Sequence, residues 1–258
     1  MNRLEGIGIV GGVGPEAGTL LHRYVIAETA RQKQTRGDRD HLPVVHISAS
    51  NCIPDRTAFL NGAETQNPAN AAFTVAQLID RTAETLGRMV VGVPCNTFHA
   101  PQIWDEFVKQ VREAPLENIE IVNMIEATGT WISNTHPNLR TIGLMSTTGT
   151  RNTGIYKKLL EARGLTVVET DRQDVLHDTI YNPDFGIKAV TPISDRAQTN
   201  FYGFARELKE KGAEALILGC TEIPLAFEGT QFEGTPLIDP MRALAAEMVG
   251  RVLESQKA

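Results

Sequence analysis

The chain has 258 residues, of which 41% are hydrophobic and 22% are charged, and its formal net charge is -6. This length and balance are typical of a globular protein with one large or two modest domains. The negative charge argues against a nucleic-acid partner. No apolar run approaches the ~18 residues that a membrane helix needs, and residues 1–6 lack the apolar stretch of a signal peptide. We therefore expect a cytoplasmic protein with no membrane partner.

In the first half of the chain, short apolar runs alternate with amphipathic stretches. The pattern predicts strands over residues 6–10, 44–47, 88–93 and 119–122, and helices over residues 15–34, 67–86 and 101–113. The small-residue loop 11–14 joins the first strand to the first helix. Pro15 suits the first turn of that helix, because its missing N–H would be unpaired there. This alternation predicts parallel strands with helices on both faces, an α/β fold.

The second half of the chain repeats the plan. Strands are predicted over residues 141–145, 165–168 and 215–218, a loop over 146–150, and helices over 152–163, 194–211 and 239–254. Gly8 precedes Cys95 by 87 residues and Gly143 precedes Cys220 by 77 residues. We therefore expect two similar α/β domains related by a pseudo-two-fold axis, with the active site in the cleft between them. The expected domains are residues 1–124 plus 236–258, and residues 125–235.

Three cysteines occur, Cys52, Cys95 and Cys220. An odd and small number argues against a disulfide framework. His99 lies four residues after Cys95, but no four ligands gather at the spacing of a structural zinc site. We expect no bound metal.

Cys95 and Cys220 each follow a predicted buried strand, and ligands of parallel α/β sheets bind beyond the carboxyl ends of the strands. Two thiols in one cleft suit a reaction that removes a proton from one face of a carbon and returns one to the other face, which is racemisation. A reference pKa of about 8.5 lets thiol and thiolate coexist near neutral pH. The alternative is that both are small core residues, and their matched positions favour catalysis. Cys52 has no such counterpart, and we expect it to be structural or a bystander.

Six segments carry a resemblance to a known family. They are Gly11-Gly12-Val13-Gly14-Pro15, Ile53-Pro54-Asp55-Arg56-Thr57, Pro94-Cys95-Asn96-Thr97, Gly149-Thr150, Ile180-Tyr181 and Leu218-Gly219-Cys220-Thr221-Glu222-Ile223-Pro224. With these the chain resembles the aspartate/glutamate racemase superfamily, in particular its aspartate racemase branch. The resemblance implies two similar α/β domains with the active site between them. It also implies catalysis without pyridoxal phosphate, metal or nucleotide, and a homodimer.

Two departures separate the chain from its relatives. Glutamate racemases of the cell-wall type carry Asp-Ser-Gly in the first loop and Cys-Thr-His in the last motif, where this chain has residues 11–14 and Glu222. Many aspartate racemases have methionine at the place of Val13. The first difference makes the glutamate racemases fit less well, and the second puts the fine substrate specificity in doubt rather than the reaction.

The resemblance assigns two cations to the substrate. Arg56 is expected to clamp the side-chain carboxylate, since a guanidinium binds a carboxylate with two parallel hydrogen bonds. Lys188 is expected to be the second cationic contact. Without the motif, Arg56 would be read as a surface residue paired with Asp55, and Lys188 as a solvated charge on a helix.

The remaining expected contacts surround the two cysteines. Asn96, Thr97 and Thr221 offer donors to the substrate carboxylate, whose charge grows as the carbanion forms. The expected set also contains Gly12, Thr150 and Glu222. Glu222 is a candidate to bind the substrate ammonium or to complement a helix N-terminus. His99 is expected either to tune the Cys95 thiol or to cap and pack a helix.

Three other functions compete with racemisation. The loop at residues 11–14 suggests a nucleotide site, but the GxGxxG pattern ends in Ala17 and no acid follows at the end of the second strand. A lyase or isomerase of dicarboxylates would fit the same paired thiols, and so would a non-catalytic ligand-binding protein. The preferred function is racemisation of aspartate, with glutamate as the alternative substrate.

Overall fold

The computed structural model describes residues 3–114 and 116–257. Contacts divide the chain into two compact units, Met1–Ala127 with Met241–Ala258, and Thr128–Pro240. The first unit is therefore discontinuous in sequence, and the second is one uninterrupted segment. These divisions lie a few residues from the boundaries expected from the sequence.

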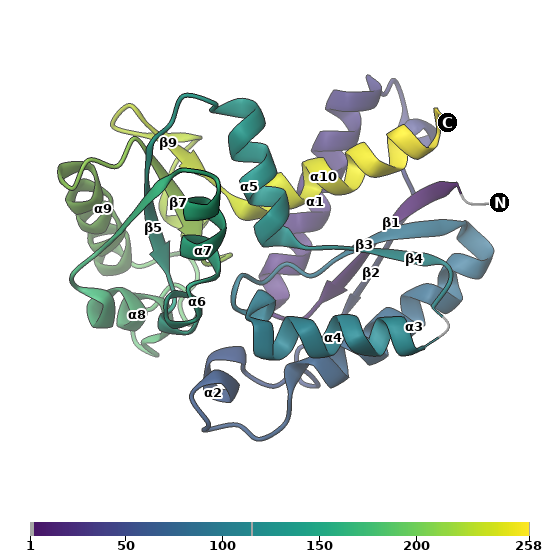
Figure 1. Ribbon diagram of the computed structural model, residues 1–258, viewed down its shortest axis with the longest axis horizontal. Helices are drawn as coiled ribbons and strands as arrows, with labels where there is room; N and C mark the ends of the chain where they lie inside the picture. Colours follow the sequence, from purple (N-terminus) through teal and green to yellow (C-terminus); the bar gives the residue numbers. More distant parts are fainter. Residues whose placement is uncertain (1–2, 115, 258) are drawn as a thin grey trace. The chain divides into compact units, whose positions relative to one another are not determined.

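The first unit is built on a parallel sheet of four strands in the order β2-β1-β3-β4 (Figure 1). The strands are β1 (Leu4–Gly11), β2 (Val44–Ser48), β3 (Arg88–Gly92) and β4 (Ile119–Val122). Its longer helices are α1 (Pro15–Lys33), α3 (Pro68–Leu86), α4 (Pro101–Glu113) and α10 (Pro240–Ser255). One face of the sheet packs on α1 and α10, and the other face on α3 and α4. Both faces are therefore apolar, as expected of a parallel sheet covered on both sides.

Four short or connecting elements complete the first unit. They are η1 (Asp38–Asp40), α2 (Arg56–Leu60), η2 (Thr97–His99) and the start of α5 (Met124–Thr135). The chain passes into the second unit within α5.

The second unit has a five-stranded sheet in the order β6-β5-β7-β9-β8. The strands are β5 (Thr141–Ser146), β6 (Thr166–Glu169), β7 (Ala215–Gly219), β8 (Gln231–Phe232) and β9 (Thr235–Ile238). The helices are α6 (Thr148–Thr153), α7 (Ile155–Ala162), α8 (Gln173–Tyr181), α9 (Asp195–Glu210) and the short η3 (Ile223–Ala226). All pairings are parallel except that of β8 with β9. The first four strands repeat the order of the first unit, so each unit has the same α/β plan.

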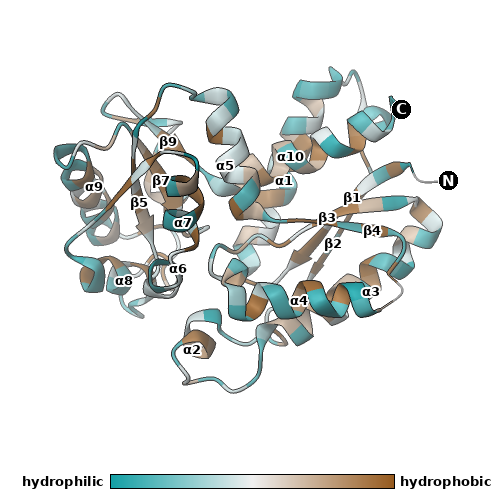
Figure 2. Ribbon diagram, in the orientation of Figure 1, coloured by the Kyte–Doolittle hydropathy of each residue, from teal (hydrophilic) through white to brown (hydrophobic). Residues whose placement is uncertain are grey.

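Apolar residues concentrate on the strands and on the helix faces that cover them, as the hydropathy colours of Figure 2 show for each unit. Within the described residues, no helix is long and apolar enough to cross a membrane.

Most predicted elements agree with the structure to within one or two residues, and one helix was wrong. Residues 152–163 are not a single helix, because Gly154 takes a left-handed conformation, with φ of 65°, and separates α6 from α7. The start of α6 also lies in the segment predicted to be a loop. Helices α2, α5 and α8 and the β8–β9 hairpin were not predicted from the sequence.

Candidate active site

Both candidate catalytic cysteines lie directly beyond the carboxyl end of a central strand. Cys95 follows β3 and Cys220 follows β7. In each sheet the cysteine-bearing strand pairs with the strand that leads into the small-residue loop, through Ile9 with Gly92 and Ser146 with Gly219. The thiols are free, and their residues are only 7% and 5% exposed. Each unit thus places one buried thiol beside one loop at the same edge of its sheet.

The glycine loop of the first unit requires glycine at its second position. Gly12 has φ of 91°, and a Cβ there would lie 2.5 Å from the Ala49 backbone nitrogen. The loop therefore packs directly on the segment after β2. Gly14 precedes α1, which begins at Pro15 without a side-chain cap.

Arg56 is the first residue of α2 and is 8% exposed, so the alternative of a surface arginine was wrong. Its guanidinium donates to the Val13 carbonyl and to the Pro54 carbonyl, at 3.2 Å each. Asp55 caps α2 by accepting a hydrogen bond from the Ala58 N–H at 2.8 Å. A permanent positive charge is therefore held at the glycine loop, in the same unit as Cys95.

The turn after β3 buries Cys95 together with Asn96 and Thr97. The Cys95 N–H donates to the Val93 carbonyl at 2.9 Å. Asn96 has helical backbone angles and leads into η2. The segment therefore presents three consecutive buried residues with polar or ionisable side chains at the sheet edge.

His99 connects this turn to the helix that follows β4. Its Nδ1 lies 2.8 Å from the Cys95 carbonyl oxygen, and its Nε2 accepts the Met124 N–H at 3.1 Å. The ring stacks on Trp104 at 4.5 Å between centroids. Burial lowers the pKa of His99 to about 4, so the imidazole is neutral at physiological pH, with Nδ1–H donating. Of the roles expected for His99, these contacts support capping, at the first N–H of α5, and packing, on Trp104.

In the second unit the Cys220 thiol belongs to a buried polar cluster. The Cys220 Sγ donates to Glu222 Oε2 at 3.0 Å, and the Thr221 hydroxyl donates to the same oxygen at 3.0 Å. Lys188 Nζ donates to Glu222 Oε1 at 3.2 Å. The Lys188 side chain is 21% exposed and that of Glu222 is 8% exposed. Glu222 thus joins the thiol to the cation.

The cluster sets the protonation of its two acids. Burial, followed by the negative charge of Glu222, raises the pKa of the Cys220 thiol well above its usual value. Burial alone would raise the pKa of Glu222, but the Lys188 charge and the hydrogen bonds from Cys220, Lys188 and Thr221 lower it below its usual value. At neutral pH the structure therefore holds a protonated thiol against an ionised carboxylate.

Thr150 lies in the first turn of α6, which follows β5. It is 1% exposed, and its N–H and hydroxyl each lie 3.2 Å from the Thr147 hydroxyl oxygen. Thr147 thereby caps α6. The helix start holds Thr150 close to the carboxyl end of β5.

The structure gathers the predicted residues into two sets, one in each unit. Gly12, Arg56, Cys95, Asn96 and Thr97 belong to the first unit, and Thr150, Lys188, Cys220, Thr221 and Glu222 to the second. Cys52 is exposed, and its Sγ lies 3.5 Å from Asn51 Oδ1. Within residues 3–114 and 116–257 no group of three or more His, Cys, Asp or Glu could hold a metal ion.

The sequence analysis missed the contacts between Glu222 and its neighbours. Glu222 was expected to bind the substrate or to complement a helix, and Lys188 to contact the substrate or to be a solvated charge on a helix. Lys188 lies in a turn after α8 and not on a helix, and it pairs with Glu222. The Cys-Thr-Glu spacing was the available signal for the thiol–carboxylate contact, whereas nothing local indicated the lysine.

Known proteins resemble the chain over nearly its whole length. The model of a family described as Asp/Glu/Hydantoin racemase matches residues 10–248. An aspartate racemase from Picrophilus torridus has a TM-score of 0.78 at 24% identity, covering 98% of each chain. An aspartate racemase homologue from Pyrococcus horikoshii OT3 has a TM-score of 0.67 at 22% identity, covering 99% of this chain and 100% of its own. A glutamate racemase from Francisella tularensis, solved with D-glutamate, has a TM-score of 0.63 at 19% identity, covering 99% and 82%. At these identities the structures establish a shared fold.

Proposed function

Because the chain belongs to the Asp/Glu/hydantoin racemase family, we propose that it interconverts L- and D-aspartate without a cofactor, using Cys95 and Cys220 as its two acid/base catalysts. The proposal rests on one observation. Each of the two units, built on the same strand order, ends a central strand in a buried free thiol beside a small-residue loop. A symmetric reaction that needs one acceptor and one donor suits such a pair.

In the proposed mechanism each thiol serves one face of the substrate α-carbon. The Cys95 thiolate takes the α-proton, and the electron pair of the broken C–H bond stays on the substrate as a carbanion. The Cys220 thiol then donates its proton to the other face and becomes a thiolate. In the opposite direction the two residues exchange roles. We assign removal of the α-proton of D-aspartate to Cys95 and that of L-aspartate to Cys220.

The cluster around Cys220 supports its role as the initial proton donor. A thiol whose pKa is raised by burial and by Glu222 is protonated at neutral pH, as a donor must be. Once Cys220 has given its proton, the new thiolate lies next to the Glu222 carboxylate, and two adjacent negative charges are unfavourable. The Lys188 ammonium offsets this cost, since it is paired with Glu222.

The remaining residues are proposed to hold the substrate. Arg56 binds the side-chain carboxylate, and Asn96, Thr97 and Thr221 donate to the α-carboxylate as negative charge grows. Gly12 lets the loop pack on the segment after β2, and the backbone N–H groups of this loop line the substrate site. Thr150 at the start of α6 and the Lys188–Glu222 pair complete the contacts, with Glu222 facing the substrate ammonium. All except Gly12 have side chains that are charged or can donate a hydrogen bond, which suits a substrate with two carboxylates and one ammonium.

The direct test is to incubate the purified protein with each enantiomer of aspartate and of glutamate, without added cofactor, and to separate the products by chiral chromatography. The expected result is inversion of aspartate from both directions, which survives dialysis against EDTA. Inversion of glutamate alone would identify glutamate as the substrate; D-glutamate is the ligand in the Francisella structure. Conversion without inversion would favour a lyase or isomerase of dicarboxylates.

Cysteine variants test the two-base mechanism. Cys95→Ser and Cys220→Ser should each lose racemisation almost completely, because a hydroxyl is a far weaker base than a thiolate at neutral pH. In D2O, each variant should still exchange the α-hydrogen of one enantiomer, and the two variants should prefer opposite enantiomers. Cys52→Ser is the matched control and should keep normal activity, since Cys52 is exposed. Normal racemisation by either of the first two variants would contradict the mechanism.

A further inference from the structure

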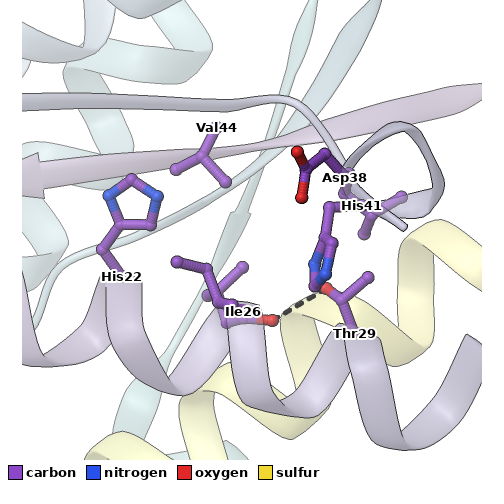
Figure 3. A pocket seen from close by; sticks show the side chains of 8 residues that line it. His22, Ile26, Thr29, Asp38, His41 and Val44 are labelled. Atoms are coloured by element: carbon purple, nitrogen blue, oxygen red, sulfur yellow. Dashed lines mark hydrogen bonds between the residues drawn. The ribbon is translucent and has the colours of Figure 1, made fainter. Parts of the chain in front are cut away.

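A pocket of about 390 Å³ lies in the first unit between α1 and the segment that leads into β2 (Figure 3). Its lining residues are His22, Val25, Ile26, Thr29, Asp38, His41, Leu42 and Val44. The volume falls in the range of small-molecule sites. None of these residues belongs to the set proposed for catalysis.

The wall of the pocket is apolar in its middle, and polar side chains lie at both ends. His22, Ile26 and Thr29 share one face of α1, with His22 about 10 Å from Thr29 along the helix axis. In Figure 3, Asp38, His41 and Thr29 gather at one end, His22 lies at the other, and Ile26 and Val44 lie between them. A ligand with an apolar body and one polar head matches this arrangement.

The polar end offers acceptors. His41 Nδ1 is buried and has no hydrogen-bond partner within the described part of the chain. The Thr29 hydroxyl gives its proton to the Val25 carbonyl at 2.7 Å, so towards the pocket it can only accept. Asp38 is exposed and carries a carboxylate for which the described residues supply no ion pair. A buried nitrogen without a partner is costly in a folded protein, and a bound donor would satisfy it.

We propose that this pocket binds a small primary amine whose body is apolar, with its ammonium between Asp38, His41 and Thr29. An ammonium has three donors and no acceptor, which matches a carboxylate, an imidazole nitrogen and a hydroxyl oxygen. The His41 ring accepts through Nδ1 in the tautomer that carries its proton on Nε2. The body of the amine packs on Val25, Ile26, Leu42 and Val44, and its far end reaches His22. The site is independent of the proposed racemase reaction.

The test uses 2-phenylethylamine as the probe, followed by amide NMR of the full-length protein. Saturable shifts confined to residues 22–29 and 38–44 are expected. Two probes share the phenylethyl body and change the head. Uncharged 2-phenylethanol should bind at least tenfold more weakly, and 3-phenylpropionate, whose charge is opposite, should not saturate. Equal binding of all three, or shifts spread over the molecule, would overturn the proposal.

Two pairs of variants distinguish binding at this pocket from general effects of the substitutions on the protein. Asp38→Asn should weaken binding of 2-phenylethylamine at least tenfold, whereas Asp105→Asn, the same change at an exposed position of α4, should not. Ile26→Lys should abolish binding by placing a cation at the pocket, whereas Leu78→Lys on α3 should leave it unchanged. The two apolar positions are closely matched, at 47% and 44% exposed. Equal affinities within either pair would refute the assignment.

Discussion

At the scale of single residues, the distinguishing feature of the candidate site is the chain of contacts Cys220–Glu222–Lys188. The carboxylate raises the pKa of the thiol, and the ammonium lowers it. The two charges therefore act on one thiol in opposite directions, and each can be removed separately.

Glu222→Gln should lower the pKa of the Cys220 thiol, because it removes the adjacent negative charge. Lys188→Met should raise that pKa further, because it removes the compensating positive charge. Both are measured by ultraviolet titration of the thiolate in a background with Cys52→Ser and Cys95→Ser, where Cys220 is the remaining cysteine of the three. Shifts of the same sign in the two variants would contradict this account of the cluster.

Variants of Arg56 test its proposed contact with the side-chain carboxylate of the substrate. Arg56→Ala should lower kcat/KM for aspartate by the equivalent of about 2–5 kcal/mol, the range for truncating one partner of a desolvated charge pair. Arg56→Lys keeps the charge but loses the planar fork, and it should also be impaired. Thermal unfolding of both variants serves as the control, since Arg56 also binds the Val13 and Pro54 carbonyls. If the alanine variant is folded and has normal kcat/KM, Arg56 does not bind the substrate.

At the scale of elements, the sequence predicted the strands better than the connections between them. Short apolar runs that end in Cys95 and Cys220 identify the strand ends, because a buried parallel strand has a strong local signal. Helix α5 was missed although it has a local start signal, since Asn123 Oδ1 accepts the Ile125 and Glu126 N–H groups at 2.8 and 3.1 Å; the distant His99 adds a bond to the Met124 N–H. The Lys188–Glu222 pair was missed because 34 residues separate its members. Contacts set by tertiary packing leave little trace in the local pattern.

His99 gives the connection between the Cys95 turn and α5 a predictable pH dependence. Its pKa is about 4 in the folded chain and about 6.5 when unfolded. Between these values the unfolded chain binds more protons, so stability falls as the pH falls through this window. From pH 7 to pH 5 the loss attributable to His99 is about 2 kcal/mol.

The measurement is urea unfolding at both pH values, followed by circular dichroism. His99→Gln cannot titrate, so its stability should be lower at pH 7 but should decline by about 2 kcal/mol less on acidification. Comparing the declines cancels the titration of other groups, including His46, whose pKa is also lowered, first by burial. Equal declines in the two proteins would mean that His99 is not held neutral.

At the scale of the whole molecule, two units repeat one strand order, but only one of them is continuous in sequence. The first unit is completed by α10 at the other end of the chain. Leu244 and Met248 of α10 lie against Gly92, where a Cβ would come within 3.2 and 2.7 Å of their side-chain atoms. The sheet that carries Cys95 therefore depends on residues synthesised after the second unit.

This arrangement predicts separable cores, and the two tryptophans report on them individually. Trp104 belongs to the first unit and Trp131 to the second. Leu244→Ala removes a fully buried side chain from the first core, and Leu216→Ala does so in the second. Each substitution should lower the free energy of unfolding of its core by about 2–5 kcal/mol.

The measurement is tryptophan fluorescence during urea unfolding, in Trp131→Phe and Trp104→Phe backgrounds that each keep one tryptophan. Leu244→Ala should lower the urea midpoint reported by Trp104 more than that reported by Trp131, and Leu216→Ala should do the reverse. If both probes shift together in both variants, the units unfold as one cooperative body, and the division into two cores does not extend to their stability.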